Sequence, residues 1–171
     1  AEDGYIEKGY ENSLLQSNQF DTTWTTLSAS VTSGQSGYDG LSDAWLLEKT
    51  GAYGRFEQAI SFGGVQTLSL YLKLENPTLA NGVQLRVDGT SGVATSSLNL
   101  ETETIISSGN AIDSKIINVG NGWYRCSLTH SFTTTIIRVY PSLNGQTFLS
   151  SGSIYIQDAQ LNQGLVAMPY L

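Results

Sequence analysis

The sequence predicts an all-β protein that folds as a single antiparallel β-sandwich of jelly-roll type. Apolar and polar residues alternate in many short segments, which is typical of antiparallel strands with one face on a core. Turn-forming residue pairs separate these segments, and about nine to eleven short strands divided in this way indicate a sandwich or jelly roll. No segment shows the apolar spacing of an amphipathic helix.

The length of 171 residues is enough for one sizeable core, so we expect one domain. Residues 1–10 are polar and acidic and are predicted to form an N-terminal arm, whereas residues 11–171 form the domain. The predicted strands, in chain order, are residues 13–17, 26–32, 44–47, 53–62, 67–74, 83–88, 123–129, 135–140 and 153–161. Turn pairs that favour positive φ or fix a bend lie at Asn76-Pro77, Asn81-Gly82, Asp88-Gly89, Asn121-Gly122 and Asn144-Gly145.

The segment at residues 123–129 shows the alternation clearly. Tyr124, Cys126 and Leu128 share one face of the predicted strand, and Trp123 and Arg125 lie on the other. The first set is expected to point inward, where a lone thiol behaves as a small hydrophobe. Since the chain has one cysteine, an intrachain disulfide and a cysteine-based zinc site are both excluded.

The last predicted strand changes its phase. Ile154 and Ile156 define one apolar face, but Ala159 and Leu161 have the opposite parity. One extra residue in the strand restores a common face, so the sequence predicts a β-bulge between Ile156 and Ala159.

The composition excludes two classes of partner. The formal net charge is −7, and binding to nucleic acid or to an anionic membrane surface requires a basic footprint. No apolar run approaches the roughly 20 residues that span a bilayer. We therefore expect neither a nucleic acid nor a membrane as partner.

Basic and aromatic residues gather on the polar faces of the central strands. If these strands belong to one sheet, that sheet displays interleaved arginine and tyrosine. Flat rings stack on the apolar faces of sugars, and forked guanidinium donors hold hydroxyls or carboxylates. Cross-strand pairs of the same residues also stabilise a sheet that binds nothing. The candidate ligand-binding residues on these strands are Tyr53, Arg55, Tyr71, Lys73, Arg86, Arg125, Arg138 and Tyr140.

Three aromatic residues beside loops extend this candidate site to the rim of the sandwich: Trp24, Tyr38 and Trp45. A loop tryptophan is either an exposed stacking platform or a plug beneath the loop, since tryptophan is mostly buried. Trp123, at the head of its strand, is expected to be a packing residue.

Asp158 is the candidate metal ligand because it lies at the predicted bulge. Together with Glu11 and Asn12 of the N-terminal segment, it could help to hold a structural Ca²⁺, which takes carboxylate and carbonyl oxygens. The alternative is an Asp that is solvated or caps a turn. Spacing alone does not give a full ligand set.

Catalysis is not expected. His130 is the only histidine, and its parity with Leu128 places it inward or half-buried. No Gly-x-Ser-x-Gly, His-Glu-x-x-His or phosphate-loop pattern occurs. We therefore predict that the protein is not an enzyme. The alternative is a polysaccharide lyase or hydrolase, which the release of unsaturated products or reducing ends from a polysaccharide would reveal.

Five segments of the chain form recognisable motifs: residues 11–20 with Trp24, residues 68–73, residues 121–126, residues 153–161 and Met168-Pro169-Tyr170. These motifs resemble those of carbohydrate-binding-module-like jelly-roll domains common in tailed-bacteriophage virion proteins. The similarity covers residues 11–171, although Gln157-Asp158 stands where the family has Trp-Gly, and Tyr38-Asp39-Gly40-Leu41 where a Pro-Asp-Gly turn is common. The motifs are mostly turn and core residues, so they indicate the fold better than the ligand.

The resemblance implies a non-catalytic domain that binds a polysaccharide or a cell-surface glycan, located outside the cell or on a virion. It also implies a structural ion near the terminal strands, as related modules carry. The alternative function is a virion structural protein, such as a capsid decoration, fibre or tail domain, that mediates assembly or host attachment. Other virion proteins or an attached catalytic domain would then be partners.

Overall fold

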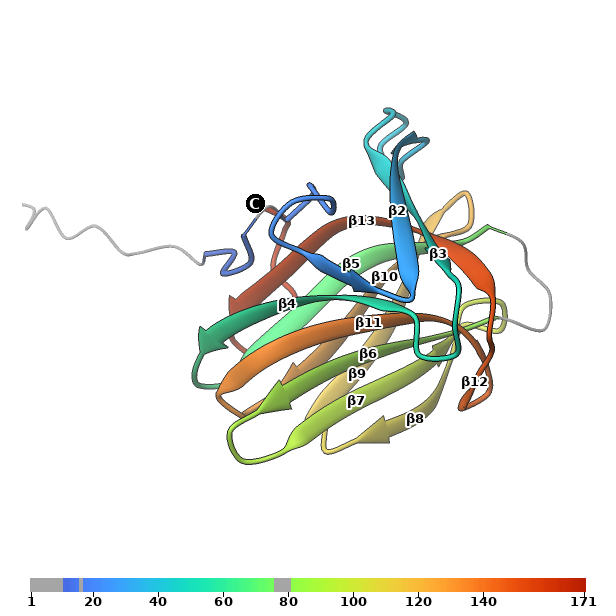
Figure 1. Ribbon diagram of the computed structural model, residues 1–171. Coiled ribbons are helices and arrows are strands. Elements are labelled where there is room, and N and C mark those ends of the chain that lie inside the picture. The colour runs from blue at the N-terminus through green and yellow to red at the C-terminus, as the bar shows by residue number, and fades with distance from the viewer. Residues whose placement is uncertain (1–10, 16, 76–80) are drawn as a thin grey trace, which may run out of the picture.

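The computed structural model describes residues 11–15, 17–75 and 81–171. The described chain forms two antiparallel sheets packed face to face (Figure 1). Its strands are β1 (Thr25–Leu27), β2 (Ala29–Gln35), β3 (Ala44–Lys49), β4 (Arg55–Phe62), β5 (Gln66–Leu74), β6 (Gly82–Gly89), β7 (Val93–Asn99), β8 (Thr104–Gly109), β9 (Asp113–Gly120), β10 (Trp123–His130), β11 (Thr134–Asn144), β12 (Thr147–Phe148) and β13 (Gly152–Gln163). The predicted all-β sandwich is confirmed.

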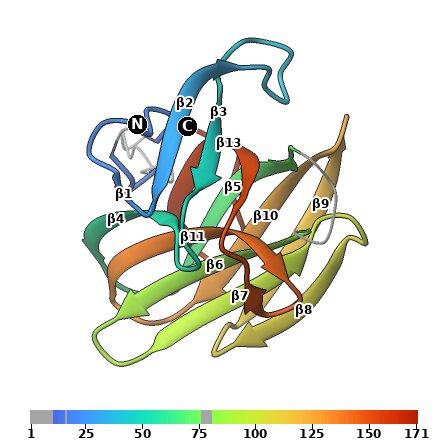
Figure 2. The same cartoon turned by 45° about the vertical axis from the view of Figure 1, so that its right-hand side comes forward.

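The two sheets, which we call sheet A and sheet B, draw their strands from the whole chain. Sheet A has the order β1-β4-β11-β6-β7-β8, and the short β12 pairs with β11. Sheet B has the order β2-β3-β13-β5-β10-β9. Figure 2 shows that β8 and β9 form the edges of the two sheets on the same side of the sandwich.

The core lies between the sheets and is formed by the apolar parity of each strand. Across this space Leu68, Leu70 and Leu72 of β5 and Cys126 and Leu128 of β10 face Ile137 and Val139 of β11, and all seven are buried. Burial of this apolar surface is the main force that holds the sheets together. The predicted inward positions of Cys126 and His130 are confirmed, since both are fully buried.

The chain passes from one sheet to the other at Ser28. Residues 26–32 were predicted as one strand, but β1 belongs to sheet A and β2 to sheet B. Ser28, between them, has a φ of 46°, which breaks the extended backbone and turns the chain across the edge of the sandwich. A pattern of alternation carries no sign of such a crossing.

The first predicted strand, at residues 13–17, is wrong for the residues that the structure describes, because residues 13–15 and 17 lie in bends, turns and irregular chain and not in a strand. They hydrogen-bond to β13 at two points: Ser13 N–H donates to the Leu161 carbonyl, and Ala159 N–H donates to the Ser17 carbonyl. The predicted arm at residues 1–10 and the turn at Asn76-Pro77 lie outside the described residues.

The predicted bulge in β13 is confirmed. The pairing of β13 with β5 shifts register between Gln157 and Gln160, and Asp158 has a φ of 49°. The extra residue lets Ile156 and Ala159 both face the core. It also leaves Gln157 and Gln160 on the outer face of sheet B.

No helix occurs in the described ranges, so none there could cross a membrane.

Candidate functional site

The predicted ligand-binding residues do not share one sheet. Arg55, Arg86, Arg138 and Tyr140 lie on β4, β6 and β11 of sheet A, whereas Tyr71, Lys73 and Arg125 lie on β5 and β10 of sheet B. In a two-layer sandwich, the outward faces of the two sheets point in opposite directions. The single Arg/Tyr surface expected from the sequence is therefore corrected to two separate surfaces.

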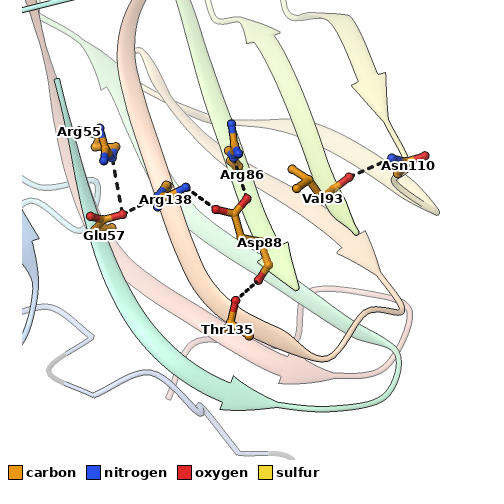
Figure 3. A network of polar contacts seen from close by, with 8 residues as sticks. All are labelled: Arg55, Glu57, Arg86, Asp88, Val93, Asn110, Thr135 and Arg138. Atoms are coloured by element: carbon orange, nitrogen blue, oxygen red, sulfur yellow. Dashed lines mark hydrogen bonds and ion pairs between the residues drawn. The ribbon is translucent and has the colours of Figure 1, made fainter. Parts of the chain in front are cut away.

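Charged residues form a continuous row on the outer face of sheet A, which we call the sheet A ladder (Figure 3). Arg138 stands at its centre: its Nε donates to Glu57 Oε2 at 2.5 Å and its Nη1 donates to Asp88 Oδ2. Arg86 Nε donates to Asp88 Oδ1 at 2.8 Å, and Arg55 Nε lies 3.5 Å from Glu57 Oε2. The order across three strands is therefore Arg55, Glu57, Arg138, Asp88, Arg86.

The register of the strands produces this row. Arg138 pairs across β11 and β4 with Glu57 and across β11 and β6 with Arg86. Two arginines directly opposite each other repel, and Asp88 offsets this because it contacts both. Burial alone would lower the pKa of Arg138, but the hydrogen bond that Arg138 donates to Glu57 and the negative charge of Asp88 raise it above its ordinary value.

An aromatic cluster adjoins the ladder. Tyr53, which is 66% exposed, lies with its ring centroid 5.4 Å from that of Phe148, and Tyr140 lies 5.2 Å from Phe148 on the other side. The Arg55 guanidinium lies 5.6 Å from the centroid of the Tyr140 ring. Tyr53 is thus a ring available to a ligand, while Tyr140 is buried and serves as support.

The outer face of sheet B is covered on one half by the closing segment, residues 164–171. Gln160 Nε2 donates to the Met168 carbonyl at 2.9 Å, and Asn162 Nδ2 donates to the Val166 carbonyl at 3.0 Å. Arg125 Nη2 also donates to the Met168 carbonyl, at 2.5 Å. Gln160 and Asn162 are fully buried. The main chain of the closing segment therefore occupies this half of the outer face of sheet B.

The other half of this face is covered by the loop between β2 and β3. The Tyr38 ring stacks on Tyr71 with centroids 3.7 Å apart, and Arg125 lies 5.5 Å from the centroid of the Tyr71 ring. The Tyr38 hydroxyl donates to Asp158 Oδ2 at 2.7 Å. Of the predicted rim residues, Tyr38 therefore lies next to the sheet, but one face of its ring is already occupied by Tyr71.

Trp24 and Trp45 are corrected from rim residues to core residues. Each is only 6% exposed. The Phe20 ring packs edge-on against both, at centroid distances of 5.3 Å and 6.0 Å, and Phe56 closes the cluster. A sugar cannot stack on these rings because apolar side chains cover them. Trp123 is buried, as expected of a packing residue.

The predicted calcium ligands have other partners. Asn12 Oδ1 accepts the N–H groups of Leu14 and Leu161, at 3.1 Å and 3.2 Å, and its Nδ2 donates to the Ala159 carbonyl at 3.0 Å. Asn12 thereby attaches the N-terminal segment to β13. Asp158 accepts the hydrogen bond from the Tyr38 hydroxyl. Glu11 also has an interaction partner. The described residues contain no group of three or more His, Cys, Asp or Glu side chains that could hold a metal ion, so the calcium site stays a prediction.

Sequence reasoning missed a pair of carboxylates beside Asp158. Burial, a hydrogen bond with Asp39 and the charges of Asp39 and Asp158 raise the pKa of Asp43 to about 6. Within the described chain, Asp43 Oδ1 is buried without a hydrogen-bond partner. Asp39 and Asp43 both lie in the loop between β2 and β3, and only their close spacing in the sequence could have indicated their contact.

Two pockets lie away from the sheet A ladder. One of about 350 Å³ is lined by residues that include Lys73, Glu75 and Tyr124, and one of about 320 Å³ by residues that include Asn18, Asp43 and Trp45. Neither of these two pockets includes a residue of the ladder.

His130 is placed for packing. Its Nδ1 accepts the Phe132 N–H at 3.2 Å, and its Nε2 lies 3.5 Å from the Thr134 hydroxyl. Burial lowers the pKa of His130 to about 4, so the ring is neutral at physiological pH. It is also fully buried, which keeps it from reaching a substrate at the surface.

No family model and no curated protein sequence matches the chain, but solved structures do. An exo-beta-agarase matches with a TM-score of 0.55 and 11% identity, over 91% of this chain and 25% of the agarase. This chain thus spans about a quarter of that enzyme. A structure of TmCBM61 in complex with beta-1,4-galactotriose has a TM-score of 0.49 and 14% identity, over 90% of this chain and 99% of that one.

A bacteriophage CBA120 tailspike protein 4 domain has a TM-score of 0.46 and 18% identity, over 91% of this chain and 21% of the tailspike chain. At such identities the similarity concerns the fold. The antiparallel β-sandwich that the sequence predicted is thus shared with the matched part of the exo-beta-agarase chain.

Proposed function

We propose that this protein is a non-catalytic carbohydrate-binding domain and that the outer face of sheet A is its binding surface. The observation that carries the proposal is the sheet A ladder beside the exposed ring of Tyr53. The outer face of sheet B is a weaker candidate because the closing segment and the Tyr38 loop cover it.

The chemistry of the ladder suits sugars. Hydroxyl groups both donate and accept, and the ladder offers guanidinium donors and carboxylate acceptors held in place by one another. The exposed Tyr53 ring supplies a surface for the apolar face of a sugar. A fixed network binds with little loss of side-chain entropy, since its members are ordered before the ligand arrives.

The proposal is in line with the ligand of one structural neighbour, since TmCBM61 was solved in complex with beta-1,4-galactotriose. A role outside the cell or on a virion, and attachment to a catalytic domain, belong to the same proposal. The buried, neutral His130 supports the non-catalytic part.

A polysaccharide panel with two matched variants tests the binding surface. Tyr53→Ala removes the exposed ring beside the ladder, and we expect it to weaken binding by about five- to tenfold, the worth of one stacking contact. Tyr155→Ala, on β13 of the opposite sheet, is the control and should bind as the unaltered protein does. Loss of binding in Tyr155→Ala alone would place the site on sheet B, and binding to no glycan would overturn the proposed function.

The second candidate function is that of a structural domain of a virion. The side of the sandwich formed by the edge strands β8 and β9 favours it. Ile105 of β8 and Ile117 and Val119 of β9 are exposed apolar side chains at the two sheet edges. Exposed apolar side chains on edge strands are typical of surfaces that meet other protein. A stable trimer by light scattering would support this function, and a monomer would favour an appended binding module.

A further inference from the structure

The charges of the sheet A ladder do not balance. It contains three arginines, at positions 55, 86 and 138, and two carboxylates, at positions 57 and 88. The ladder therefore carries 3 − 2 = +1 in a chain whose formal net charge is −7. Both of its ends are cationic, because Arg55 and Arg86 are the outermost members.

Three of the four carboxylate oxygens of the ladder contact its arginines, while guanidinium donors remain. Asp88 gives one carboxylate oxygen to Arg86 and the other to Arg138, and Glu57 Oε2 faces both Arg138 and Arg55. Arg86, in contrast, uses only its Nε, and its two terminal nitrogens make no hydrogen bond to any described residue. Its side chain is 34% exposed, so this fork of donors is open to a ligand.

The surroundings of Arg86 can bind hydroxyl groups. On the register of sheet A, Arg86 pairs with Thr95, and the neighbouring Gln84 pairs with Ser97. Gln84 Nε2 donates to the Ser97 hydroxyl at 3.1 Å, which leaves the amide oxygen of Gln84 as an acceptor. A guanidinium fork beside hydroxyl and amide groups matches a sugar that carries an acidic substituent.

An anion at Arg86 would also relieve a repulsion within the sheet. Arg86 and Arg138 are direct cross-strand partners on β6 and β11, and like charges in this position destabilise the pair. Glu57 and Asp88 compensate for two of the three positive charges of the ladder, and a bound anion would compensate for the third. A neutral sugar offers no such gain.

We propose that the sheet A ladder binds a glycan that carries anionic groups, uronate carboxylates or sulfate esters, and that Arg86 is the anchoring residue. This inference rests on the proposed function, because it specifies the ligand class of the same surface. The rest of the acidic chain repels a polyanion, so the attraction comes from the ladder.

The test compares glycans that differ only in charge. Polygalacturonate is measured against its methyl ester, and a sulfated galactan, carrageenan, against chemically desulfated carrageenan, by calorimetry at low ionic strength. We expect at least one acidic glycan to bind about tenfold or more tightly than its neutral counterpart, the worth of a charge-assisted fork. The two pairs show whether carboxylate or sulfate is preferred.

Two variants locate the effect. Arg86→Gln should abolish most of the difference between the acidic and neutral forms, and Arg86→Lys should retain part of it. Lys115→Gln is the control, because it removes the same charge from an exposed residue on β9 of the other sheet. Lys115→Gln should leave the difference unchanged.

The outcomes separate the two proposals. Equal binding of acidic and neutral forms would overturn the anionic ligand and leave carbohydrate binding intact. Equal loss in Arg86→Gln and Lys115→Gln would also overturn it, since the attraction would then reflect overall charge. Binding to none of these glycans, nor to the wider panel, would overturn the proposed function itself.

Discussion

At the residue scale, alternation predicted which way side chains point but not what covers them. Arg55, Arg86 and Arg138 all lie on outward parity, as expected. Trp24 and Trp45 were assigned to the rim because they adjoin loops, yet Phe20 and Phe56 enclose them in the core. The sequence cannot show this, since a loop residue is buried or exposed according to segments far away along the chain.

Asp43 is expected to make stability depend on pH. Its pKa is raised from 3.8 to about 6 in the folded protein by burial, the hydrogen bond with Asp39 and the nearby negative charges. Between about pH 4 and pH 6 the folded state keeps a proton that the unfolded chain has lost. The contribution of Asp43 to the free energy of unfolding therefore falls as the pH rises through this range.

We predict that Asp43→Asn raises the melting temperature at pH 7.5 and changes it much less at pH 3, where Asp43 is mostly protonated in both the folded and the unfolded state. Thermal melting followed by circular dichroism at the two pH values measures this. Glu48→Gln, which replaces an exposed carboxylate on β3, is the control and should shift neither midpoint. An equal shift of the Asp43→Asn midpoint at both pH values would contradict the prediction.

At the scale of elements, strands with a regular apolar face were predicted well and polar strands were missed. The bounds of β5, β6 and β10 agree with the predicted segments to within one residue at either end. The strands β7, β8 and β9 had no assigned segment. In β7 the inward residues are Ala94, Ser96 and Leu98, and a buried serine interrupts the apolar pattern.

The closing segment, residues 164–171, is attached to the sandwich through Gln160, a role that the sequence pattern does not reveal. Gln160 Nε2 donates to the carbonyls of Met168 and Pro169, and its Oε1 accepts the Leu171 N–H at 3.0 Å. We predict that Gln160→Ala lowers the free energy of unfolding by about 1–3 kcal/mol, since each lost hydrogen bond contributes roughly 1 kcal/mol.

Urea unfolding measures this effect, and Gln163→Ala is the matched control. Gln163 lies on the same strand and its side chain is exposed. Limited proteolysis should also cut the closing segment sooner in Gln160→Ala than in Gln163→Ala. The same loss of stability in both variants would mean that the segment is held by other contacts.

At the scale of the whole molecule, sequence reasoning gave the architecture but not the assignment of strands to sheets. Lys73 and Arg86 both lie on polar faces of alternating strands, and nothing local reveals that β5 and β6 belong to different sheets. Long-range pairing decides this: β13, the last strand, lies between β3 and β5, and β11 lies between β4 and β6. The candidate site is therefore divided between two faces, and the closing segment and the loop between β2 and β3 cover much of the part on sheet B.

The last prediction concerns the fold as a whole: Ca²⁺ binds the native protein and stabilises it through Asp158. A ligand that binds only the folded state stabilises it by mass action, so a concentration of about one hundred times the dissociation constant adds about 2.7 kcal/mol. For a chain of this length, that corresponds to a rise in melting temperature of about 5 °C or more.

Thermal melting in the presence of Ca²⁺ and in the presence of a chelator measures this rise. Asp158→Asn should remove the difference, whereas Asp113→Asn, which alters an exposed carboxylate on β9, should preserve it. Coincident curves for the unaltered protein would refute calcium binding and leave Asp158 as the acceptor that holds Tyr38 over sheet B.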